Sequence, residues 1–274
     1  MRKLKDLTEE EKLGVFLRKK EGVPVQKIKE EFGISDRSYY DILRKNGWEI
    51  KKKVQKYNFT EDYFETIDTE DKAYFFGFIL ADGCVRSIKS QKMTLKLKKD
   101  NFSIIETFIN FINYQGLPYY FDDYVQITLS GSKIIDDLNN LGITENKTMI
   151  VKYPIIPENL NRHFMRGVFD GDGCISIHHD KRDNSDRGQV NICSGSINFI
   201  NTYVDNLVNY TNVKRNNIRC PRGTYYVIDW GGLTDVENIY NFFYKNATVF
   251  LERKKETFDK VITINNSKNK YRKK

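Results

Sequence analysis

Two segments of this sequence, ninety residues apart, run a helix-like stretch directly into an Asp-Gly pair. The first is YFFGFILADGC from Tyr74, and the second is HFMRGVFDGDGC from His163. The first is apolar on nearly all sides, so it predicts a helix that is buried over most of its surface. Gly77 lies in its interior, where glycine costs about 1 kcal/mol relative to alanine, and Gly167 lies at the matching place in the second. We interpret these glycines as points where two backbones pack closely.

The elements predicted after each segment also repeat. In each case alternating patterns predict a pair of strands, then a helix, then a further strand region and a last helix. Both copies therefore indicate an αββαββα unit of about a hundred residues. The expected fold class is α+β, with repeats at 57–153 and 154–274 related by a pseudo-two-fold axis in one monomer. Residues 1–56 are expected to form a separate module.

A pseudo-two-fold axis would place the two glycine-bearing helices side by side. Each helix would then place one carboxylate at the interface between the two helices, which we call the seam: Asp82 from the first copy and Asp172 from the second. Two carboxylates at one seam are costly unless a positive charge lies between them. A divalent cation with oxygen ligands meets this need, and Mg²⁺ is the ion that we expect.

Charge is distributed unevenly along the chain. The formal net charge is +8, and residues 1–56 contain 16 Lys and Arg against 10 Asp and Glu. Most of the excess positive charge thus lies in the first fifth of the chain, which favours a polyanionic partner. The four cysteines form no CxxC pair, so neither a zinc cage nor a disulfide framework is predicted. The sequence contains no secretion signal and no apolar run of about 18 residues, so a cytoplasmic protein is expected.

Three short helices are predicted in the amino-terminal module. Thr8 begins a capping box, a second helix runs from about Val25 to Phe32, and Ser35 or Asp36 caps a third. The arrangement resembles a helix-turn-helix, with Gly33 in the turn. The residues expected to face inward are Leu13, Phe16, Leu17, Val25, Ile28, Phe32, Tyr39, Ile42 and Leu43.

On the third helix, Arg37, Tyr40 and Arg44 point away from the apolar face. These side chains are suited to a DNA groove and its phosphates, and an ordinary solvated basic face is the alternative. Lys51–Lys53 is interpreted as a linker or as an arm that contacts phosphate.

The two repeated segments resemble the signature of the LAGLIDADG homing endonucleases in their single-chain, two-repeat form. The nine-residue pattern of that family falls on Phe75–Gly83 and on Met165–Gly173. The resemblance implies that Asp82 and Asp172 bind metal and that the preceding residues, Ala81 and Gly171, offer backbone carbonyls. Copy one departs from the pattern at Leu80, where copy two has Asp170.

Members of that family also place a lysine near each metal site. The candidates here are Lys147 and Lys254, with Lys255 as a competitor for the second place. Such a lysine stabilises charge on the phosphate or helps to activate water. Surface lysines at helix ends are the alternative interpretation.

The resemblance further implies a saddle of two antiparallel sheets whose exposed faces bind double-stranded DNA. Side chains of suitable chemistry alternate with apolar ones along the predicted strands. The candidates for DNA contact are Arg86, Thr94, Lys96, Lys98, Ser176, His178, Gln189 and Asn191.

The function implied is site-specific cleavage of both strands of a long DNA target with Mg²⁺, for which Mn²⁺ can substitute. Two alternatives stay open. One is a regulator with the same fold that binds DNA without cleaving it, although both metal-binding acids are present here. The other is an RNA maturase that assists intron splicing, since a basic saddle also suits structured RNA.

Overall fold

The computed structural model describes residues 2–47, 57–88, 90–181 and 184–272. The chain divides into two compact units, Met1–Lys56 and Tyr57–Lys274. The predicted linker around Lys51–Lys53 lies outside the described residues. Among the residues that are described, no helix has both the length and the apolar character needed to cross a bilayer.

The amino-terminal unit consists of a 3₁₀ turn, η1 (Leu4–Asp6), and three helices: α1 (Glu9–Lys20), α2 (Val25–Phe32) and α3 (Asp36–Lys45). Thr8 and Glu11 form the predicted capping box, and the hydroxyl of Ser35 caps α3. Its small core includes Ile28, Tyr39, Ile42 and Leu43, as predicted. Gly33 ends α2 in the left-handed conformation that glycine adopts without strain.

The predicted inner face of α1 is confirmed at Phe16, which packs against the core of this unit, and is wrong at its two leucines. Leu13 and Leu17 are 51% and 46% exposed, whereas Val15 is fully buried. The cause is the place where α2 approaches, since a Cβ atom at Gly14 would lie 3.0 Å from the ring of Phe32. Val15 is two residues from each leucine, so burying it turns both leucines to the opposite side of the helix.

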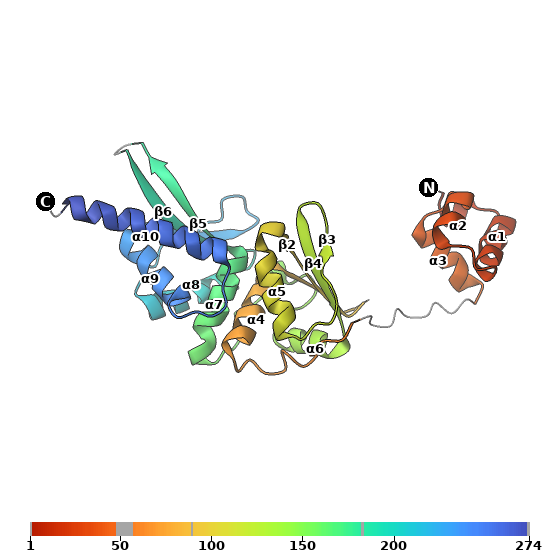
Figure 1. Cartoon of the computed structure of the whole chain (residues 1–274), viewed down its shortest axis with the longest axis horizontal. Coiled ribbons are helices and arrows are strands. Elements are labelled where there is room, and N and C mark those ends of the chain that lie inside the picture. The colour runs from red at the N-terminus through yellow and green to blue at the C-terminus, as the bar shows by residue number, and fades with distance from the viewer. Residues whose placement is uncertain (1, 48–56, 89, 182–183, 273–274) are drawn as a thin grey trace. The chain divides into compact units, whose positions relative to one another are not determined.

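The second unit contains two repeats of similar order (Figure 1). The first comprises α4 (Glu70–Asp82), β1 (Gly83–Arg86), β2 (Lys92–Lys98), η2 (Lys99–Asn101), α5 (Phe102–Phe111), β3 (Tyr119–Tyr120), β4 (Tyr124–Ser130), α6 (Ser132–Asn140) and η3 (Lys147–Met149). The second comprises α7 (Glu158–Asp172), β5 (Gly173–Asp180), β6 (Ser185–Ser194), α8 (Ile197–Thr211), β7 (Tyr226–Trp230), α9 (Leu233–Tyr244) and α10 (Glu252–Arg272).

Each repeat forms one antiparallel sheet, with strand orders β1-β2-β4-β3 and β5-β6-β7. The α+β class predicted from the sequence is confirmed. In the second repeat a single bridge between Arg219 and Val227 stands where the first repeat has strand β3. One continuous apolar core runs through both repeats.

Helices α4 and α7 lie side by side at the centre of this unit (Figure 1). A Cβ atom at Gly77 would overlap the carbonyl oxygen of Phe164, and one at Gly167 would overlap that of Tyr74. The two backbones therefore touch at these glycines, which confirms the close approach expected from their positions. The packing of α4 against α7 therefore positions the C-terminal ends of the two helices, and the last residue of each helix is an aspartate.

Candidate functional site

The two aspartates of the repeated segments occupy equivalent places. Asp82 is the last residue of α4 and Asp172 the last residue of α7, and the glycine after each begins a strand. A carboxylate at a helix C-terminus is unfavourable because that end carries partial negative charge. Within the described part of the chain, neither carboxylate has a hydrogen bond or an ion pair. The structure therefore brings together two carboxylates that no hydrogen bond or ion pair from the described residues holds.

The pKa values of Asp82 and Asp172 are both raised, as expected for two carboxylates without a bonded partner. Both residues are exposed at the surface, and the protein atoms around the two helix ends remove part of their hydration. This burial raises the pKa of Asp172 to about 6, with the charge of Asp82 as the next contribution. Burial also raises the pKa of Asp82, against the opposing charges of Lys254 and Lys147. The repulsion between the two ionised groups is relieved by protonation of one of them or by a cation bound between them.

The donor atoms at this seam suit a hard divalent cation. A Cβ atom at Gly171 would overlap the Cβ of Ala81, so the residues preceding the two aspartates face each other across the seam. The same Cβ position lies 3.5 Å from Oδ2 of Asp82. No group of three His, Cys, Asp or Glu side chains able to hold a metal ion exists among the described residues. Any ion here must therefore also use backbone carbonyls, water or phosphate oxygens, as Mg²⁺ commonly does.

Lys147 is the first residue of η3, and the fold brings its side chain to the C-terminal end of α4. Its Nζ donates a 2.6 Å hydrogen bond to the carbonyl oxygen of Gly83. Burial lowers the pKa of this lysine, and the charge that most opposes the lowering is that of Asp172, in the other repeat. An ammonium has three N–H donors, so one hydrogen bond leaves two for another oxygen ligand.

Lys254 is held differently at the end of α7. It is only 3% exposed, and its Nζ donates to the carbonyl oxygens of Phe169 and Asp170 at 2.7 Å and of Gly173 at 2.5 Å. The carbonyl oxygen of Gly171 lies 3.5 Å away. Burial lowers the pKa of Lys254 to about 8. Its donors are occupied by the turn that carries Asp172, so it is suited to fixing that turn. The competing residue, Lys255, instead pairs with Asp259 at 3.2 Å.

The sheet candidates of the first repeat lie on one face. Arg86, Lys96 and Lys98 are exposed and Thr94 is partly exposed, while the intervening residues of β2 are buried. Register places Arg86 opposite Lys92, on the same face as Thr94. The ammonium of Lys96 lies over the ring of Tyr124, 4.6 Å from its centroid. This face therefore carries cationic and aromatic side chains together.

The second sheet presents a more polar face. Ser176 pairs with Gln189 in the register of β5 and β6, and His178 is exposed two residues further along. Asn191 is on the same face, and the amide of Gln189 donates to Asp229 at 3.2 Å. Ile177, which the alternation predicts to face inward, is 38% exposed because β5 continues beyond the region where β7 completes the sheet.

The candidates in the amino-terminal unit are exposed on α3. Arg37 and Arg44 are exposed, and Tyr40 is 39% exposed with its ring against that of Tyr39. Arg44 pairs with Asp41 at 2.9 Å, an exposed contact that phosphate can replace at little cost.

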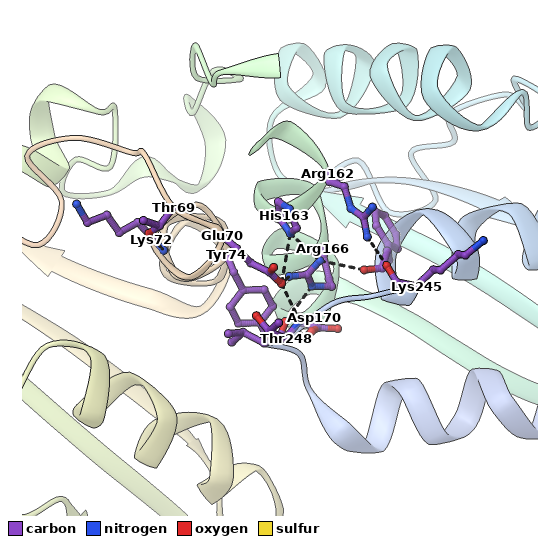
Figure 2. A network of polar contacts seen from close by, with 12 residues as sticks. Thr69, Glu70, Lys72, Tyr74, Arg162, His163, Arg166, Asp170, Lys245 and Thr248 are labelled. Carbon is purple, nitrogen blue, oxygen red and sulfur yellow. Dashed lines mark hydrogen bonds and ion pairs between the residues drawn. The ribbon is translucent and has the colours of Figure 1, made fainter. Parts of the chain in front are cut away.

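Sequence reasoning missed a buried polar network beside the seam (Figure 2). Arg166 is fully buried and donates to Glu70, and Asp170 is 1% exposed and accepts from Tyr74. A signal for it was present in the sequence, because Arg166 and Asp170 are charged residues four positions apart in a helix where the first copy has Phe76 and Leu80.

Comparison with known proteins identifies the fold. No family model matches the chain, and no curated protein matches it. Solved structures do match. The LAGLIDADG meganuclease I-AabMI bound to uncleaved DNA aligns at 16% identity with a TM-score of 0.51, covering 71% of this chain and 91% of that one. The LAGLIDADG homing endonuclease I-GzeII in complex with a DNA target aligns at 12% identity with a TM-score of 0.55, covering 74% and 92%.

A third structure, the LAGLIDADG homing endonuclease I-SmaMI bound to cleaved DNA, aligns at 12% identity with a TM-score of 0.52 and covers 74% of this chain and 91% of that one. Identities this low establish the fold alone. Over about three quarters of its length, as these alignments cover it, this chain has the fold of the LAGLIDADG homing endonucleases.

Proposed function

We propose that this protein is a site-specific DNA endonuclease that hydrolyses phosphodiester bonds in both strands of a duplex, with Mg²⁺ held by Asp82 and Asp172. The observation that carries the proposal is the pair of carboxylates without protein partners at the ends of two helices in backbone contact. Structures with the same fold are bound to DNA, and one is bound to cleaved DNA.

The residues at the seam have distinct proposed roles. Asp82 and Asp172 bind the cation, and the carbonyls of Ala81 and Gly171 add oxygen donors. When bound, the cation supplies Lewis-acid stabilisation of the phosphate and a water of lowered pKa. Lys147 offers its two remaining N–H groups to the phosphate, while Lys254 holds the turn before Asp172 and contributes its charge through space.

The DNA partner follows from the exposed sheet faces. A two-stranded antiparallel ribbon fits the major groove, where lysine, arginine, glutamine and asparagine read base edges. The first sheet offers Arg86, Thr94, Lys96 and Lys98, and the second offers Ser176, His178, Gln189 and Asn191. Two such sheets in one monomer suit a long target, and the basic amino-terminal unit adds phosphate contacts through Arg37, Tyr40 and Arg44.

The experiment compares cleavage and binding on the same DNA. The DNA substrates are overlapping duplexes that together cover the sequence on both sides of the gene, joined as if the gene were absent. Each is incubated with the full chain in Mg²⁺, in Mn²⁺, in Ca²⁺ or in excess chelator. Cleavage is expected in Mg²⁺ and Mn²⁺ only, and binding without efficient cleavage is expected in Ca²⁺, which is larger and less strict in geometry.

The decisive variants are Asp82→Asn and Asp172→Asn. Each keeps the side-chain volume but removes a charge next to the cation, so cleavage of both strands should fall by at least about a hundredfold while DNA affinity stays near that of the parent. Asp68→Asn, at an exposed ion pair with Lys72 just before α4, is the control and should cut normally. Normal cutting by both seam variants would exclude the proposed chemistry. A parent that binds a duplex and never cuts it would favour a DNA-binding regulator.

A further inference from the structure

The seam contains a third carboxylate, Asp170, which is buried and fully hydrogen-bonded. Its Oδ2 accepts from the hydroxyl of Tyr74 at 2.8 Å and from the backbone N–H of Leu251 at 2.7 Å. Its Oδ1 accepts from the hydroxyl of Tyr244 at 2.6 Å. Tyr74 comes from the first repeat and the other residues come from the second. One carboxylate thus joins the helix of one repeat to the segment of the other repeat that leads into α10 (Figure 2).

Leu251 connects this carboxylate to Lys254. The carbonyl of Leu251 accepts from the backbone N–H of Lys254 at 3.0 Å, at the beginning of α10. The side chain of Lys254 then returns to the carbonyl of Asp170 itself at 2.7 Å. The hydrogen bonds therefore close a ring from Asp170 through Leu251 and Lys254 back to Asp170, and the hydroxyl of Tyr74 is attached to that ring from outside the repeat.

A second carboxylate fixes the same segment a few residues earlier. Oε1 of Glu70, in the first turn of α4, accepts from the backbone N–H of Thr248 and from Arg166, each at 2.8 Å. Arg166 also donates to the carbonyl of Val249 at 2.9 Å. The segment before Lys254 is thus held by one carboxylate from each repeat, and both hydrogen-bond sets include α4.

Among its described residues, the first repeat has no such attachment through a buried carboxylate. Phe76 and Leu80 occupy the positions of Arg166 and Asp170, and both are buried among apolar residues. Lys147 is therefore held at its helix end by one hydrogen bond, to the carbonyl of Gly83. The segment of Lys147 is attached to the second repeat through a hydroxyl instead: Ser196 donates to the carbonyl of Val151 at 2.6 Å, and the N–H of Val151 donates to the carbonyl of Lys147 at 2.8 Å. The placement of Lys254 thus depends on the other repeat through a buried carboxylate, and that of Lys147 does not.

We propose that Tyr74 of the first repeat is a positioning residue for Lys254 of the second, acting through Asp170 and Leu251. Tyr244 acts on the same carboxylate from within the second repeat. The consequence for DNA cleavage rests on the proposed nuclease function: loss of the Tyr74 hydroxyl slows cleavage of one strand, the strand that depends on Lys254, more than cleavage of the other.

The test uses Tyr74→Phe and Tyr244→Phe, which remove only a hydroxyl. Tyr63→Phe is the matched control, because the hydroxyl of the buried Tyr63 donates to the carboxylate of Asp71 at 2.6 Å, outside the hydrogen-bonded ring of Asp170, Leu251 and Lys254. Amide hydrogen exchange is measured first, in the full chain without DNA or metal. In peptides covering 248–254 exchange should become about tenfold faster in the two seam variants and stay unchanged in the control. Unchanged exchange in both seam variants would overturn the positioning role.

The second measurement follows each strand of a cleaved duplex separately, at saturating enzyme in Mg²⁺, with affinity measured in chelator. Tyr74→Phe should slow one strand about tenfold, at unchanged affinity, and that strand should be the one that Lys254→Met slows most. In the Lys254→Met background the Tyr74→Phe effect should disappear, since coupled residues are not additive. Equal slowing of both strands, or additive effects, would contradict the proposal. If the parent cleaves no duplex, the proposed nuclease function fails, and the exchange measurement alone decides the positioning role.

Discussion

The two repeats build the same helix end by different means. In the first, the helix that carries Asp82 is apolar from Ala73 to Ala81, with Phe76 and Leu80 packed in the core. In the second, Arg166 and Asp170 occupy those places, and each is fully hydrogen-bonded within the interior. The first repeat thus relies on apolar burial, and the second adds buried charge.

This difference shows what each repeat has to hold. Buried charges are a poor source of stability, because desolvation offsets most of their attraction. They do fix neighbouring groups in one geometry. Here they fix the backbone from Thr248 to Leu251, which a helix end made only of apolar side chains would not hold. We infer that the second repeat gives up stability for a defined position of the segment before α10.

The largest effect expected from breaking this asymmetry is on stability. Arg166→Met leaves the carboxylate of Glu70 and the carbonyls of Phe243 and Val249 without their partner, so the free energy of unfolding should fall by about 3–5 kcal/mol. Phe76→Leu, at the matching position of the first repeat, should cost only about 1–1.5 kcal/mol. Chemical denaturation measures both.

A double variant sharpens this result. Adding Glu70→Gln to Arg166→Met removes the unpaired charge, so part of the lost stability should return. Equal costs for Arg166→Met and Phe76→Leu would show that the two helices are held alike.

Substitutions of Lys254 and Lys147 should affect stability and cleavage to different extents. Lys254→Met removes three hydrogen bonds to carbonyls at the end of α7 and should lower the free energy of unfolding by about 1–3 kcal/mol. Lys147→Met removes one hydrogen bond and should leave stability nearly unchanged, while single-turnover cleavage falls about 10²–10³-fold. Thermal unfolding and cleavage of one duplex, measured on both variants, check this. The reverse pattern would assign the direct phosphate contact to Lys254.

The smallest expected effect is on the pH dependence of stability. Burial and the charge of Arg166 lower the pKa of His163 to about 4, and Ala73 stands at the matching position of the first repeat. The unfolded chain therefore takes up a proton near pH 6.5, before the folded chain does, and stability is lost as the pH falls from about 7 toward 4. The share of His163 between pH 7 and 6 is on the order of 1 kcal/mol.

His163→Ala should flatten that acid limb in denaturation curves. Asp172 contributes in the opposite sense in metal-free protein, because its raised pKa makes stability increase as the pH falls through about 6. The difference between variant and parent is therefore the informative quantity. An unchanged slope would mean that the pKa of His163 is the same in the folded and the unfolded chain.

Much of the fold was open to prediction because the repeats carry strong local signals. The capped helices, the seam glycines and the aspartates at helix ends all follow from residue type and spacing. The inner face of α1 did not, since Val15 is buried only because Gly14 admits Phe32. That contact lies outside the periodicity of α1 itself.

The network around Asp170 was beyond sequence reasoning for a related reason. Its partners are Tyr74, Tyr244 and Leu251, which are 96, 74 and 81 residues distant. Sequence periodicity reports which side of an element is buried and carries no information about which distant hydroxyl meets a buried charge. The different roles of Lys147 and Lys254 depend on the same kind of long-range contact.

The contact between Gly77 and Gly167 has a consequence for how such a protein can change over time. Because the two helices touch through their backbones, the spacing between Asp82 and Asp172 is set by main-chain geometry and not by adjustable side chains. In the proposed nuclease this spacing determines the offset between the cuts in the two DNA strands. Substitutions on the sheets can then alter which DNA is recognised while the shape of the cut ends is inherited unchanged.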